Sequence, residues 1–64
     1  MLTVVYVAPD LPVAERLKDV LEGEGIMATL RPVGAGKHRN YYEILVSELE
    51  AEEAQDILCR SMGS

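Results

Sequence analysis

A single cysteine and a single histidine limit how this chain of 64 residues can stabilise a fold. A domain of this size buries only about 60% of the surface that its unfolded chain exposes, so it usually needs additional support. Cys59 cannot form an internal disulfide, and together with His38 it does not make a structural zinc site. The sequence therefore predicts one domain, residues 1–64, with no metal or cofactor, supported by a regular core or by self-association.

The apolar stretches of the sequence are too short for a membrane span, which needs roughly 18 to 20 such residues. The start, MLTVVYVAPD, lacks the positively charged segment of a signal peptide. A lone thiol without an export signal is typical of a cytoplasmic protein. We therefore expect a cytoplasmic protein, and its acidic composition is typical of bacterial proteins.

The formal net charge of −5 is unevenly distributed along the chain. Residues 25–42 hold three basic and no acidic residues, which gives +3, and the remainder holds three basic and eleven acidic residues, which gives −8. Three cations are a small footprint for nucleic acid, and an acidic surface is repelled by anionic lipids. We expect neither nucleic acid nor a membrane as a partner.

Two segments have the apolar spacing of amphipathic helices. Residues 11–24 follow Asp10, a good N-cap, and Gly25 can end this helix in the left-handed conformation. The segment SELE, residues 47–50, fits a capping box for a second helix to about residue 61, although Glu50 could begin that helix alone. The predicted core stripes are Val13, Ala14, Leu17, Val20 and Leu21 in the first helix, and Ala51, Ala54, Ile57 and Leu58 in the second.

Three segments have the pattern of strands. LTVVYVA, residues 2–8, is a continuous run of apolar and β-branched residues, which predicts a strand covered at least partly on both faces. IMATLRP, residues 26–32, and YYEILVS, residues 41–47, alternate instead. Their predicted core-facing residues are Ile26, Ala28, Leu30, Tyr42, Ile44 and Val46.

The order strand, helix, strand, strand, helix predicts the topology. The second and third strands are joined by about eight residues and should form an antiparallel hairpin. A right-handed crossover then places the first strand parallel to the third, with both helices on one face. We expect an α+β fold, a β-α-β-β-α two-layer sandwich whose three-stranded sheet has the order 1-3-2. It is ferredoxin-like but lacks the last strand.

This topology leaves a free edge on the first strand and an uncovered sheet face. The first strand contributes to that face either Val5 and Val7 or Leu2, Val4 and Tyr6. We expect a homodimer that forms either by edge pairing of the first strand or by stacking of the uncovered faces. The candidate interface residues are Val5, Val7, Met27, Tyr41 and Leu45.

The segments VYVAPDLPVAERLKDVLEGEGIMA and EILVSELEAEEAQDIL carry a resemblance to a known family. The chain resembles small prokaryotic domains named as signal-transducing proteins, whose molecular function is unknown. A strand ending in Tyr-x-Ala-Pro and a helix ending in Leu-x-x-x-Leu-x-x-x-Gly match Tyr6, Ala8 and Pro9, and Leu17, Leu21 and Gly25. Ser47 departs from the pattern, in which a proline often precedes the acidic helix start. The resemblance implies a signalling or regulatory role.

The segment VGAGKHRNYY, residues 33–42, places glycines beside cations. It is not a nucleotide P-loop, because His38 follows Lys37 where a serine or threonine is needed and a strand follows the loop. A looser anion site and a plain hairpin loop both remain open. The candidate ligand-binding residues are Arg31, Gly34, Gly36, Lys37, His38 and Arg39.

No set of residues in the sequence predicts catalysis. His38 has no nucleophile or carboxylate beside it, Cys59 is expected to be half-buried, and the acidic residues 48–53 are expected to cap a helix. We therefore expect a non-enzymatic regulatory module that acts through self-association or a protein partner. The alternative is a sensor of a small anionic ligand that uses loop 33–40.

Overall fold

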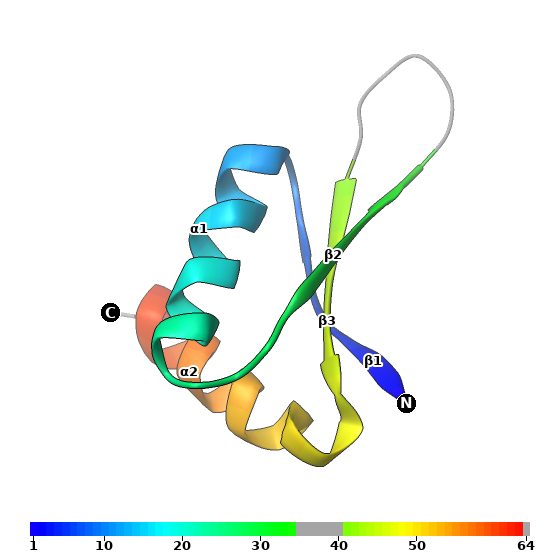
Figure 1. Ribbon diagram of the computed structural model, residues 1–64. Helices are drawn as coiled ribbons and strands as arrows, with labels where there is room; N and C mark the ends of the chain where they lie inside the picture. Colours follow the sequence, from blue (N-terminus) through cyan, green and yellow to red (C-terminus); the bar gives the residue numbers. More distant parts are fainter. Residues whose placement is uncertain (35–40, 64) are drawn as a thin grey trace.

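The computed structural model describes residues 1–34 and 41–63 of the chain. The elements are β1 (Leu2–Ala8), α1 (Leu11–Gly23), β2 (Thr29–Val33), β3 (Tyr41–Ser47), a 3₁₀ turn η1 (Glu48–Glu50) and α2 (Ala51–Gly63). The strands form one sheet in the order β1-β3-β2, and both helices pack on the same face of it (Figure 1). The predicted α+β class, element order and sheet order, those of a ferredoxin-like half, are confirmed.

The direction of β1 differs from the prediction. β1 runs antiparallel to β3, from Leu2 opposite Ser47 to Ala8 opposite Tyr42. β2 is also antiparallel to β3, so β1 and β2 run parallel to each other with β3 between them. The predicted parallel pairing of the first and third strands is wrong. The crossover through α1 brings the chain back so that β2 runs in the same direction as β1. The hairpin that follows β2 then reverses the chain for β3.

Helix α1 begins and ends as its sequence predicts. The Asp10 carboxylate accepts a hydrogen bond from the backbone nitrogen of Val13 at 3.1 Å, which satisfies one free donor of the first turn. Pro12 lies in that first turn, where its missing N–H costs no helical hydrogen bond. Gly25 has a φ of +89°, and the nitrogen of Ile26 donates to the Leu21 carbonyl at 3.0 Å. This left-handed residue turns the chain back toward the sheet.

The start of the second helix is displaced by one turn. The Ser47 hydroxyl accepts a hydrogen bond from the backbone nitrogen of Leu49 at 3.2 Å and caps η1. The α-helix itself begins at Ala51 and continues to Gly63, two residues beyond the predicted end. Ser47 is therefore a cap, but the tighter 3₁₀ turn separates it from α2.

Strand β2 is shorter than its alternating pattern. Residues 26–28 precede the ladder, which begins with Thr29 opposite Leu45. Ile26 is nevertheless buried, because this segment crosses from the end of α1 to the sheet through the core. The sequence predicts that Pro32 marks either the end of a strand or an edge strand. It lies within β2, whose position at a sheet edge tolerates a residue without an N–H.

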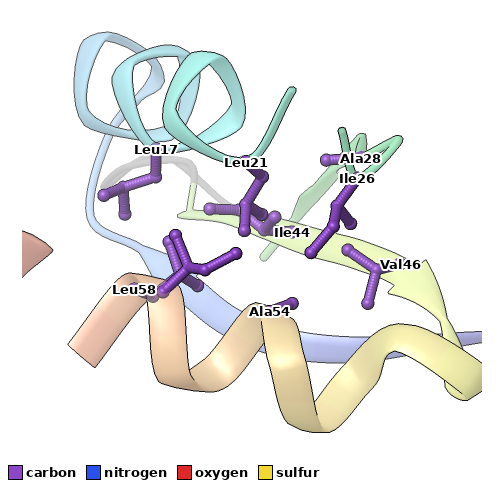
Figure 2. Close-up of a cluster of buried hydrophobic side chains, with 9 residues drawn as sticks. Leu17, Leu21, Ile26, Ala28, Ile44, Val46, Ala54 and Leu58 are labelled. Carbon is purple, nitrogen blue, oxygen red and sulfur yellow. The ribbon is translucent and has the colours of Figure 1, made fainter. Parts of the chain in front are cut away.

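The core lies between the two helices and the covered sheet face (Figure 2). Leu21 and Ile44 are completely shielded from solvent, and Leu30 packs against the cluster from β2. Both helical stripes and the alternation of the last two strands are therefore correctly predicted. The buried cluster consists of Leu17, Leu21, Ile26, Ala28, Ile44, Val46, Ala54, Ile57 and Leu58.

Replacement of Leu21 by alanine should lower the free energy of unfolding by about 2–5 kcal/mol, because it removes buried methyl groups and leaves a cavity. Urea denaturation measures this loss. Gln55→Ala is the control, since Gln55 is exposed on α2 and its loss should change stability by less than about 0.5 kcal/mol. A loss below about 1 kcal/mol at Leu21 would contradict the packing of α1.

Two neighbouring glycines provide a matched test of the turn after α1. A Cβ atom would meet nothing within 4 Å at Gly23 or at Gly25, but only Gly25 has a positive φ. Gly25→Ala should therefore destabilise the chain by about 1–2 kcal/mol through backbone strain. Gly23→Ala should be neutral or stabilise it by up to about 1 kcal/mol, because alanine is the better helix former. Equal effects in thermal or urea denaturation would contradict the left-handed turn.

Candidate functional site: the open face of the sheet

A β-bulge in β1 decides which of its side chains face the core. Val4 lies opposite Leu45 and Tyr6 lies opposite the adjacent Ile44, so Val5 is an extra residue in the ladder. Val5 and Tyr6 both pack against the core cluster. The bulge thus shifts the alternation by one residue and returns Val7 to the opposite face.

We call the sheet face that the helices do not cover the open face. Its residues follow from the pairing register, because partners on adjacent strands point to the same side. Neither alternative that the sequence allows for β1 is complete, because the open face combines Leu2 and Val4 with Val7. The residues of the open face are Leu2, Val4, Val7, Thr29, Arg31, Val33, Tyr41, Glu43, Leu45 and Ser47.

Several apolar side chains of the open face are accessible to solvent. Leu2 is 57% exposed, Val7 47% and Tyr41 44%. Leu45 differs, because it lies on the central strand between Val4 and Thr29 and is only 5% exposed. Of the predicted interface residues on the strands, Val7 and Tyr41 therefore offer surface to a partner. Leu45 is buried beneath its neighbours, and Val5 is half-buried and packs against the core cluster on the other face.

The apolar surface continues at one end of the sheet. The backbone nitrogen of Glu48 donates to the Met1 carbonyl at 3.0 Å, which brings the η1 turn beside the start of β1. Met1 and Leu49, at this end, are each 93% exposed. Met27, predicted for the interface, lies before β2 and is 78% exposed, beside a depression of about 380 Å³ that Glu22, Gly25 and Ile26 also line.

A cross-strand ion pair lies on the open face. Arg31 of β2 is directly opposite Glu43 of β3, and its Nε donates to Glu43 Oε1 at 2.8 Å. The Nη2 group of Arg31 contacts the same oxygen. The two charges cancel, so the described part of the open face carries no net charge.

The predicted anion site falls mostly outside the described residues. Gly36, Lys37, His38 and Arg39 belong to residues 35–40, so the anion-binding hypothesis stays a prediction. Gly34, at the end of β2, is exposed and has a φ of +95°. Arg31 is engaged by Glu43, which leaves less of its hydrogen-bonding capacity for an anion.

The helical layer carries most of the acidic residues. Ten of the eleven acidic residues, all except Glu43, belong to the helices, to η1 or to their caps. The same elements hold three basic residues, Arg16, Lys18 and Arg60. These numbers give −7 for this part of the chain. The layer therefore differs sharply from the neutral open face.

A groove of about 440 Å³ separates the two helices at one end. Val13, Arg16, Leu17 and Val20 of α1 line it together with Ser61 and Met62 of α2. Its lining combines apolar side chains with the cation Arg16 and the hydroxyl of Ser61. The described lining residues do not indicate which class of ligand this groove would bind.

Chemically reactive side chains do not converge over residues 1–34 and 41–63. Cys59 is exposed on α2, so its predicted half-burial is wrong; the buried stripe of this helix ends with Leu58. In this part of the chain, no three His, Cys, Asp or Glu side chains are placed to hold a metal ion. None of the helices described has the length and apolar character to cross a membrane.

Comparisons with models of protein families, with characterised proteins and with solved structures find no match to this chain. The resemblance to the signal-transducing domains therefore stays a prediction from sequence motifs.

The strength of the Arg31–Glu43 pair can be measured with a double-mutant cycle. The two side chains are 57% and 20% exposed, so solvent screens their attraction. The cycle of Arg31→Ala, Glu43→Ala and the double variant should give a coupling free energy of about 0.2–1 kcal/mol in urea denaturation. A coupling near zero would contradict a stabilising role of the pair.

Proposed function

We propose that this chain is a non-enzymatic regulatory module that acts through association, with the open face as its contact surface. The observation that carries the proposal is the set of exposed apolar side chains on this face, among them Leu2, Val7 and Tyr41. An apolar patch rimmed by polar residues on a small protein is typical of an interaction surface. The first partner to test is a second copy of the chain, as in most homo-oligomers.

Two further considerations support the proposal. The core cluster of the described residues holds nine buried residues, and the single cysteine allows no internal disulfide, so burial of the open face would add stability that a domain of this size lacks. The resemblance to small prokaryotic signal-transducing domains implies a regulatory role. The proposal assigns the module to the bacterial cytoplasm, where an exposed thiol such as Cys59 stays reduced.

Sedimentation equilibrium over a concentration range of about 1–300 µM tests self-association, because weak interfaces dissociate in this range. We expect the average mass to rise above the 7.0 kDa of one chain as the concentration increases. Val7→Lys should raise the dissociation constant at least about tenfold, because it places a charge in the apolar contact.

Gln55→Lys is the matched control for this experiment. Gln55 is exposed on α2, and its replacement changes the net charge by the same single unit as Val7→Lys. The control should leave the dissociation constant within about threefold of the wild type. A mass of 7.0 kDa at every concentration would contradict self-association.

A further inference from the structure

We infer that the open face is covered by a second copy of this chain, stacked face to face across a two-fold axis. This inference rests on the proposed function and adds the identity of the partner and the mode of contact. Both stacking and edge pairing are compatible with the exposed residues alone. Charge and the two sheet edges favour the stacked arrangement, and the small size of the face predicts that the contact is weak.

The distribution of charge permits two copies to meet through the open face. Contact through the helical layers would bring two surfaces of −7 together, and like charges in contact disfavour association. The open face carries the compensated Arg31–Glu43 pair and apolar side chains, so two copies of it present no excess of like charge. Face-to-face stacking also leaves the acidic layers on the outside of the dimer.

Both edges of the sheet carry features that hinder strand pairing. The bulge at Val5 interrupts the regular alternation of backbone donors and acceptors along β1, so an added strand would need a matching irregularity. The other edge, β2, contains Pro32, which has no N–H to donate. Natural sheets use such features against edge-to-edge association.

The size of the open face predicts a weak dimer. Three strands spaced by about 4.8 Å, with seven residues rising by about 3.3 Å each, project to roughly 300 Å² per copy. Side-chain relief and the neighbouring Met1 and Leu49 enlarge this area. A stable interface buries about 800 Å² per partner, so this contact belongs to the class of weak, transient interfaces.

Two arginine substitutions distinguish the open face from the helical layer. Arg31→Glu and Arg16→Glu both change the net charge from −5 to −7, but Arg16 is exposed on α1. Arg31→Glu places two carboxylates on each stacked face and should weaken the dimer at least about tenfold. Arg16→Glu should weaken it by less than about threefold, because its charge stays on the outer side.

The double variant Arg31→Glu/Glu43→Arg controls for folding. It reverses the ion pair, keeps the face neutral and should restore the dissociation constant to within about threefold of the wild type. Circular dichroism and urea denaturation check that each variant is folded.

Hydrogen exchange distinguishes the two dimer modes. Edge pairing would protect the outward-facing amides of β1 from exchange as the protein concentration rises, whereas stacking would not.

The outcomes separate the two levels of the proposal. A wild-type chain that is monomeric throughout the sedimentation experiment overturns self-association itself. A wild-type dimer that Arg31→Glu and Arg16→Glu weaken equally overturns only the assignment to the open face. Concentration-dependent protection of the β1 amides overturns stacking in favour of edge pairing.

Discussion

A sheet has two faces, and the helices of this chain cover only one of them (Figure 1). This constraint determines the rest of the structure. The core must be built on one side from short apolar stripes, and Leu21 and Ile44 lie at its centre, completely buried. The apolar residues that do not fit on that side, such as Leu2 and Val7, remain on the other. The open face is thus a direct consequence of a two-layer fold with an apolar first strand.

The elements with clear periodicity were predictable from the sequence. The stripe that includes Leu17 and Leu21 and the alternation around Ile44 each allow one buried arrangement, because the opposite register would expose apolar and bury charged side chains. The caps at Asp10 and Gly25 depend on local chemistry and were also predictable. The direction of β1 relative to β3 follows from the chain connections, because the crossover through α1 keeps the direction of the chain and the hairpin reverses it; the pairing is antiparallel and not parallel as predicted.

The candidate site was only partly predictable because β1 has no polar residue at alternating positions. An apolar run fits the sheet in either register, and nothing in its letters marks the bulge at Val5. The sequence therefore offered two mutually exclusive sets for this strand, whereas the structure takes Val4 from one set and Val7 from the other. The Arg31–Glu43 pair had no local signal either, because it depends on the register between two strands. The pair becomes visible only when the register of β2 against β3 is known, which places Arg31 opposite Glu43.

The separation of charge between the two layers makes each chain an electric dipole, with its negative end on the helical side. Stacked sheets lie about 10 Å apart, and each helical layer lies beyond its own sheet. In a stacked pair the acidic sides are thus farther apart than the Debye length of about 8 Å at physiological ionic strength. Dissolved salt screens their mutual repulsion while the apolar contact between the sheets is unaffected. Association of this kind strengthens as ionic strength rises toward the physiological range, the reverse of recognition between oppositely charged surfaces.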